Sequence, residues 1–158
     1  AGGAVVDLHI HDADFVHHLL GMPDEVSATG VTAPDGQVDY LVTQYRYHGR
    51  NRCITAASGN LGMAGLMFEH GYDAYFQRGT LRYNSARGEG VELFTEDGQK
   101  QLADVTAPDA FVAELTAAVT AVRTGEGGAL SAASARNALR LVLAEAESVR
   151  TGRPVTVK

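Results

Sequence analysis

The first 21 residues constrain the fold of this chain more than any other stretch. They hold four of its six histidines and the aspartates Asp7, Asp12 and Asp14. As a strand, this segment would place His9 and His11 on one face, where both could bind one metal ion. As a helix, it would point the two histidines about 200° apart and stack Asp7 one turn from His11. The secondary structure here therefore decides between two kinds of chemistry.

The spacing of the apolar residues predicts a helix over residues 4–20. These residues recur at three- and four-residue steps: Val5, Leu8, Phe15, Val16, Leu19 and Leu20. Gly21, followed closely by Pro23, predicts the end of the helix. The helix would carry a polar stripe made of Asp7, His11, Asp14 and His18. A stripe of this kind is often only the solvated face of an amphipathic helix, so spacing alone leaves its role open.

Composition excludes several classes of function. The chain has 158 residues, which suffice for one domain with a core, and its net charge is −6 with no run of Lys or Arg. Nucleic acid and anionic membranes are therefore poor candidate partners. No apolar run approaches the roughly 20 residues that span a bilayer. A single cysteine, Cys53, permits no internal disulfide and favours a reducing, cytoplasmic location.

The start of the chain suggests a part of a longer protein. It has neither an initiator methionine nor a signal peptide, and the predicted helix begins almost at once. We therefore expect one domain over residues 1–158, cut from a longer chain. A processed N-terminus is the alternative.

After this helix, the pattern predicts a series of strands. The ranges are 25–31, 38–48, 53–57, 66–77, 79–84 and 91–94, with a last edge strand at 155–157. The glycine-rich segment 58–65 has neither phosphate-binding glycine pattern, so we interpret it as a flexible connection.

Two helices are predicted in the last third of the chain. Thr106 and Asp109 have the spacing of a capping box ahead of a helix that ends near Thr124. Ser131 is a candidate N-cap for a long second helix, and Gly152 and Pro154 lie where that helix should stop.

This order of elements predicts an α+β fold with an open, largely antiparallel sheet and helices packed on one face. We expect the other face of the sheet to carry four tyrosines: Tyr45, Tyr47, Tyr75 and Tyr83. Contact between such faces would join copies of the chain into a homodimer or tetramer.

Both ends of the chain resemble one family. The stretch GGAVVDLHIHDADFVHHLLG resembles the helix that opens the C-terminal domain of the Gfo/Idh/MocA oxidoreductases, which typically has the pattern GG-x-x-x-D-x-G-x-H-x-x-D. The tail LSAASARNALRLVLAEAESVRTGRPVTV is similar to the closing helix of the same domain, and FQRGTLRYN to its G-x-x-G-x-L strand pair. The resemblance spans the whole chain, and it departs from the pattern at His9, where the family usually has glycine.

The resemblance implies an NAD(P)-dependent oxidoreductase of sugars, polyols or related secondary alcohols. In such enzymes a Rossmann domain holds NAD or NADP and supplies a catalytic lysine. This chain has no such domain, so we expect it to bind no cofactor alone and to be inactive in isolation. By the same match, Asp7 and His11 fall on the catalytic aspartate and histidine, and Asp14 on a substrate-binding aspartate. Asp7 would orient His11, the proton acceptor.

Two other functions are open. D-L-H-I-H-D resembles the first metal motif of amidohydrolases and of polymerase-and-histidinol-phosphatase-type phosphoesterases, which would make the chain a metal-dependent hydrolase. Such enzymes need a longer barrel and further ligands, whereas His48 and His70 are the only later histidines. A non-enzymatic interaction domain is the other alternative. We expect no metal site.

Overall fold

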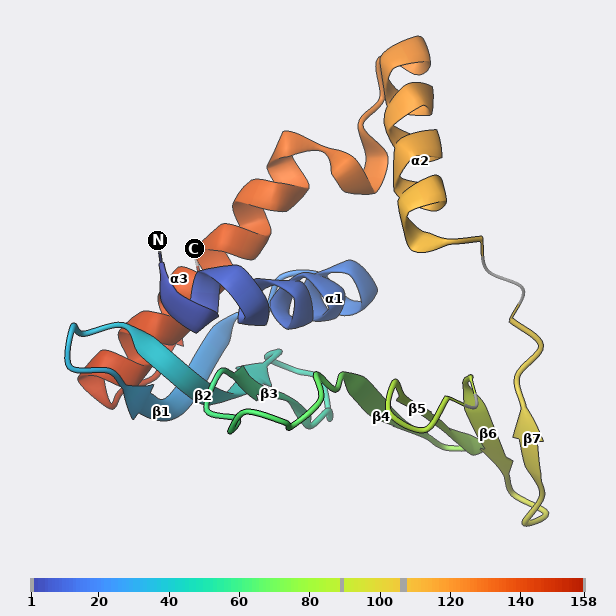
Figure 1. Ribbon diagram of the computed structural model, residues 1–158, viewed down its shortest axis with the longest axis horizontal. Coiled ribbons are helices and arrows are strands. Elements are labelled where there is room, and N and C mark those ends of the chain that lie inside the picture. Colours follow the sequence, from blue (N-terminus) through green and yellow to red (C-terminus); the bar gives the residue numbers. More distant parts are fainter. Residues whose placement is uncertain (1, 89, 106–107, 158) are drawn as a thin grey trace. The chain divides into compact units, whose positions relative to one another are not determined.

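The computed structural model describes residues 2–88, 90–105 and 108–157 (Figure 1). Contacts divide the chain into two compact units. Unit 1 comprises residues 1–61 and 116–158, and unit 2 comprises residues 62–115. The described residues form three α-helices and two open antiparallel sheets, so the predicted α+β class is confirmed. The strands form two separate sheets, where the sequence suggested one.

The first helix confirms the helical interpretation of the N-terminal segment. A π-helix, η1 (Val5–His9), runs directly into α1 (Ile10–Leu20). Gly21 ends the helix with a φ of 78°, and its N–H donates to the His17 carbonyl at 2.8 Å. A residue with a side chain rarely adopts this backbone conformation, which explains the glycine. The strand interpretation, and with it the pairing of His9 and His11 on one face, is wrong.

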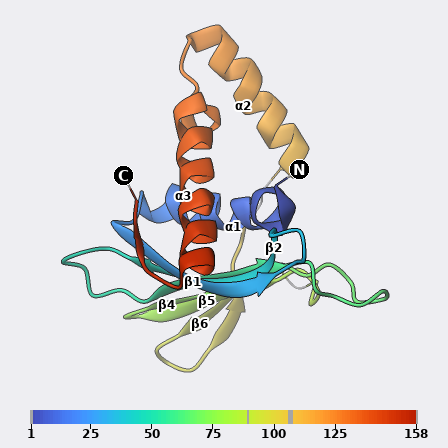
Figure 2. The ribbon, with the colours of Figure 1, turned by 90° about the vertical axis from the view of Figure 1, so that its left-hand side faces the viewer.

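Unit 1 is built on a sheet of four strands in the order β3-β2-β1-β8. They are β1 (Glu25–Thr32), β2 (Val38–Arg46), β3 (Ile54–Gly59) and β8 (Val155–Thr156). Figures 1 and 2 show α1 and α3 (Ala132–Thr151) on the same face of this sheet. The core lies between them, and its fully buried side chains include Val26, Leu41, Tyr45, Leu141 and Val142.

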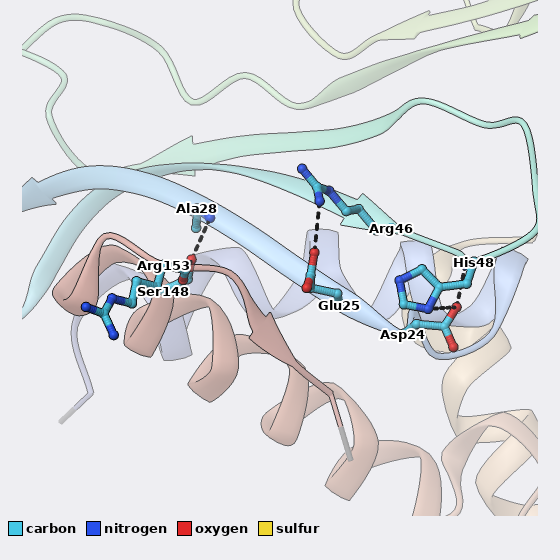
Figure 3. A network of polar contacts seen from close by, with 7 residues as sticks. All are labelled: Asp24, Glu25, Ala28, Arg46, His48, Ser148 and Arg153. Carbon is cyan, nitrogen blue, oxygen red and sulfur yellow. Dashed lines mark hydrogen bonds and ion pairs between the residues drawn. The ribbon is translucent and has the colours of Figure 1, made fainter.

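The end of α3 is fixed to β1 by one serine. The Ser148 hydroxyl accepts from the Ala28 N–H at 2.9 Å and donates to the Arg153 carbonyl at 2.7 Å (Figure 3). The predicted caps of α3 are confirmed, because the Ser131 side chain accepts from the Ser134 N–H and Gly152 adopts a left-handed conformation. The helix is therefore held at both ends.

Polar pairs join the start of β1 to the end of β2. Arg46 donates to Glu25 at 3.1 Å, and the His48 N–H donates to the Asp24 carboxylate at 2.6 Å (Figure 3). Both ionic side chains of the first pair are partly solvated, so the pair adds little stability.

Unit 2 contains a second antiparallel sheet in the order β4-β5-β6-β7. Its strands are β4 (Gly71–Phe76), β5 (Gly79–Asn84), β6 (Glu92–Thr95) and β7 (Lys100–Leu102). The predicted strand 66–77 begins too early, since residues 66–70 lie outside the sheet, and β7 was not predicted. No apolar residue described in unit 2 is buried.

The helix α2 (Ala110–Thr124) has an exposed apolar stripe. It buries none of its residues, although the sequence predicted a side facing the core. The exposed members are Phe111, Val112, Leu115, Val119 and Val122. The Asp109 carboxylate accepts from the Phe111 and Val112 N–H groups and so caps the helix itself. Thr106, the other half of the predicted capping box, lies outside the described residues. A short 3-10 helix, η2 (Gly128–Leu130), precedes α3.

The predicted positions of two tyrosines are wrong. Tyr45 and Tyr47 are 1% and 8% exposed, and they face the helices rather than the open side of the sheet. Leu41 and Thr43, which share their strand face, are fully buried too. Both faces of β2 carry apolar residues, so its alternation alone could not tell which face the helices would cover.

Candidate functional site

The polar stripe predicted for the first helix lies on the exposed side of η1 and α1. Asp7, His11 and His18 are exposed, and Asp14 is half-buried. Within the described part of the chain, neither Asp7 nor His11 has a side-chain hydrogen bond or ion pair. The π-helical turn places more residues in each turn than an α-helix does, so Asp7 and His11 do not stack as an ideal α-helix would stack them.

Asp14 has a partner of its own. Its carboxylate lies 3.9 Å from Nδ1 of His17, three residues later on the same helix. This distance allows only a weak interaction, and Asp14 is half exposed. The carboxylate therefore stays accessible beside His11.

Apolar side chains accompany the polar stripe on the surface of α1. Phe15 is 43% exposed and Leu19 is 59% exposed, both on a helix whose other side packs against the core through Ala13 and Val16. A surface that combines a histidine, two carboxylates and apolar rims is suited to contact with a ligand or with another domain.

His9 lies on the opposite side of the helix and is fully buried. Its Nε2 lies 2.6 Å from a carboxylate oxygen of Glu145, a residue of α3 that is also fully buried. Its Nδ1 lies 2.6 Å from the Ser58 hydroxyl at the end of β3. Burial, and next the charge of Glu145, raise the pKa of the Tyr45 hydroxyl well above its usual value. His9, Ser58, Tyr45 and Glu145 thus form a buried polar cluster.

Only part of this cluster could be predicted from the sequence. His9 was identified as a departure from the glycine of the family pattern, but its partners were not. Leu139, although apolar, is 40% exposed on α3. The side that is buried carries Ala138, Leu141, Val142, Glu145 and Ser148. Glu145 is one turn beyond Leu141, and this was the signal available for a buried carboxylate.

The two histidines of the possible metal motif lie on opposite sides of the helix. His9 contacts Glu145 in the core, whereas His11 is exposed on the other side. In residues 2–88, 90–105 and 108–157, no group of three or more His, Cys, Asp or Glu side chains could hold a metal ion. The structure gives no support to the alternative of a metal-dependent hydrolase.

Comparisons with known proteins identify the family. The family model described as "Oxidoreductase family, C-terminal alpha/beta domain", that of the Gfo/Idh/MocA proteins, matches residues 1–157. The chain belongs to the Gfo/Idh/MocA oxidoreductase family. No curated protein matches the sequence.

Solved structures share this Gfo/Idh/MocA domain fold. A levoglucosan dehydrogenase in complex with NADH and levoglucosan matches with a TM-score of 0.81 at 16% identity, over 99% of this chain and 50% of that one. An oxidoreductase from Agrobacterium radiobacter, in complex with NAD+, L-tartaric acid and magnesium, has a TM-score of 0.75 at 19% identity and coverages of 96% and 48%. A probable dehydrogenase from Thermotoga maritima has a TM-score of 0.73 at 24% identity, with coverages of 99% and 50%. The chain thus spans about half the length of these neighbours.

The glycine-rich segment of this Gfo/Idh/MocA domain differs in its setting from a dinucleotide-binding turn. A pyrophosphate is usually held where a glycine-rich turn joins a strand to the N-terminus of a helix. Here the glycine-rich segment 58–65 leads from β3 toward β4 instead. No helix in the described parts of the chain combines the length and apolarity needed to cross a membrane.

Proposed function

We propose that this chain is the substrate-binding and oligomerisation domain of an NAD(P)-dependent oxidoreductase that acts on a sugar, a polyol or a related secondary alcohol. The observation that carries the proposal is the stripe on η1 and α1, with Asp7, His11 and Asp14 exposed in a domain of the Gfo/Idh/MocA family. The substrate class is supported by a neighbour of the same fold that was solved with levoglucosan. We propose a cytoplasmic location, consistent with the single exposed Cys53.

A residue of the stripe can accept the proton that the substrate hydroxyl loses. Oxidation of a secondary alcohol to a ketone removes the hydroxyl proton together with a hydride, and the nicotinamide of NAD or NADP accepts the hydride when it is bound. His11, exposed on the helix, acts as the proton acceptor, because imidazole can gain and lose a proton near neutral pH. Asp7 orients His11 when substrate is bound, and Asp14 donates no proton but accepts a hydrogen bond from a substrate hydroxyl.

The stripe requires a second domain. We propose that a dinucleotide-binding Rossmann domain covers the exposed side of α1 and supplies a lysine to the site. The exposed Phe15 and Leu19 support this contact, since a covering domain would remove them from water. Calorimetry on this chain alone should detect no binding of NAD or NADP, and micromolar binding would contradict this division of roles.

The test of function is His11→Ala in the longer protein that carries both domains. Loss of a positioned general base should lower turnover about 10²–10⁴-fold. The fold and the affinity for dinucleotide should stay close to those of the unsubstituted enzyme. His18→Ala is the matched control, because His18 lies on the same exposed stripe and is not assigned to the site. If both variants are equally mild, the stripe is a solvated face and the protein has an interaction role.

We also propose a homodimer or tetramer formed through sheet faces. In unit 1 the helices cover one face of the sheet, while Val31 and Val42 remain 50% and 42% exposed. In unit 2 the apolar residues Tyr75 and Phe76 are 73% and 64% exposed. Burial of such faces between copies is a common route to symmetric oligomers. Sedimentation at tens of micromolar should show a dimer or tetramer, and a monomer would contradict the proposal.

A further inference from the structure

The buried cluster around His9 links three elements through one side chain. The imidazole comes from η1, the Ser58 hydroxyl from the end of β3, and the Glu145 carboxylate from the middle of α3. Both nitrogens of the ring are in contact, at 2.6 Å on each side. A ring held at both nitrogens has little freedom to rotate, so the turn that carries it is also fixed.

The ring of His9 contacts polar groups through both of its nitrogens. Nε2 faces a carboxylate oxygen of Glu145 at 2.6 Å. The hydroxyl of Ser58 can either donate to Nδ1 or accept from it, and Asp12 lies 3.7 Å from the same nitrogen. The Tyr45 hydroxyl, from β2, also faces Glu145. The cluster is therefore anchored by the contact between Nε2 and Glu145, whichever way Ser58 points.

The position of His9 in the sequence gives this anchor a consequence for the exposed stripe. His9 is the last residue of the π-helix, with Asp7 two residues before it and His11 two residues after it. Its side chain points into the core while Asp7 and His11 are exposed. π-helical turns are rare and often accompany functional sites. A buried anchor at the end of this turn fixes the rotation of the helix, and thereby the direction in which Asp7 and His11 face.

We propose that the buried His9–Glu145 pair holds η1 in its π-helical conformation. The position of η1 in turn aligns His11 with the substrate hydroxyl. His9 and Glu145 are positioning residues that act through His11, and neither touches the substrate. This inference rests on the proposed role of His11. It adds that turnover depends on the contacts that α3 and β3 make with His9.

The experiment replaces the polar pair with an apolar pair in the longer, two-domain enzyme. His9→Leu combined with Glu145→Leu removes the anchor but leaves no buried charge without a partner, so the fold should remain stable. We expect kcat to fall by up to about 10²-fold, as for other small misalignments of a catalytic group. KM and the dissociation constant of NAD(P) should change little. A double variant that folds and keeps the kcat of the unsubstituted enzyme would overturn the proposal.

Two single variants keep the test decisive. Glu145→Gln retains the shape of the side chain and its polar contact to Nε2, so it should retain most of the turnover. Glu147→Gln changes the same charge at an exposed position on α3 and is the control. If the double variant does not fold, Glu145→Leu alone removes the partner of Nε2 while Ser58 still contacts Nδ1, and it should lower kcat with KM unchanged. Unchanged kcat in Glu145→Leu would then overturn the proposal.

The outcome is separable from that of the proposed function. If His11→Ala leaves turnover intact, the role of His11 fails, and with it any positioning of that residue. If His11→Ala is severe while the apolar double variant retains full kcat, the proposed function stands and the His9–Glu145 pair is only part of the packing.

Discussion

The two units of this chain differ in how their residues are protected from water. Unit 1 has a core between its sheet and two helices, in which Leu41, Leu141 and Val142 are completely buried. In unit 2 Glu92 is the only described residue that is buried, through its ion pair with Lys100. Both units contain four antiparallel strands, so strand pairing is common to them and the packed helices are not.

This difference indicates what holds each unit together. Burial of apolar surface is the main favourable term in folding, and unit 1 obtains it internally. Unit 2 has ladder hydrogen bonds, but none of its described apolar residues is buried. Sheets without a hydrophobic cover are marginal in water. We therefore expect unit 2 to be stabilised by contacts with other surfaces. The candidate site lies on a helix of unit 1, where the framework is rigid.

The strongest test of the core of unit 1 is His9→Ala. It leaves the Glu145 carboxylate buried without its partner, so we expect a loss of about 3–5 kcal/mol in the free energy of unfolding. Chemical denaturation followed by circular dichroism would measure this. The control is His48→Ala, at an exposed position, which should cost far less. A similar small cost for both would mean that the buried pair contributes no stability.

The next test compares the two units directly. Leu141→Ala creates a cavity in unit 1 and should cost about 2–5 kcal/mol of unfolding free energy. Phe76→Ala in unit 2 removes a side chain that is already 64% exposed in one chain. The loss of unfolding free energy in Phe76→Ala should be small in a monomer and larger in an oligomer that covers the Phe76 side chain. Denaturation measured at several protein concentrations separates these cases.

If Phe76→Ala were as costly as Leu141→Ala at every concentration, the contrast between the units would be wrong. Equal costs would mean that unit 2 protects this side chain without any partner.

A third test concerns the attachment of α3 to the sheet. Ser148→Ala leaves the buried Ala28 N–H without its acceptor, which should cost about 1–3 kcal/mol. Thr151→Ala, at the exposed end of the same helix, is the control. Native-state hydrogen exchange should show faster exchange of the Ala28 amide in Ser148→Ala. Unchanged exchange there would show that another acceptor replaces the serine.

The smallest expected effect is a pH dependence within unit 2. A hydrogen bond from Arg82, 2.7 Å away, holds the pKa of the Asp73 carboxyl below its usual value. The folded state therefore binds a proton less readily than the unfolded state. The stabilisation is complete above the ordinary carboxyl pKa of about 3.9 and disappears as the pH falls through the lower, folded value.

Amide protection in β4 and β5, measured by NMR as the pH is lowered, should show this loss. Asp73→Asn should remove that part of the pH dependence, and Asp104→Asn, also exposed in unit 2, should not. Equal behaviour of the two variants would contradict the assignment. The effect is small because both partners are solvated.

Much of the local structure could be predicted from the sequence. Periodicity predicted the first helix, and glycines predicted its end at Gly21 and that of α3 at Gly152. Alternating β-branched and aromatic residues located most strands, and β5 had the predicted bounds. These features depend on neighbours a few residues apart, whose preferences the sequence carries directly.

The candidate site was predicted only as a stripe of exposed residues. Asp7, His11 and Asp14 were identified from helical spacing and from the family pattern, and spacing does establish that they share a side of the helix. The catalytic roles remain proposals, because they depend on a substrate and a second domain.

Other features were decided by the tertiary structure alone. Tyr45 and Tyr47 were expected on an open face, yet they lie in the core, because the side of β2 that the helices cover depends on packing. The contact of His9 with Glu145 joins residues more than 130 positions apart, and no local preference encodes it. The sequence determined the helices, most of the strands and the exposed stripe. Only the packing of α3 against η1 determined that His9 belongs to the core, since burial depends on which elements meet.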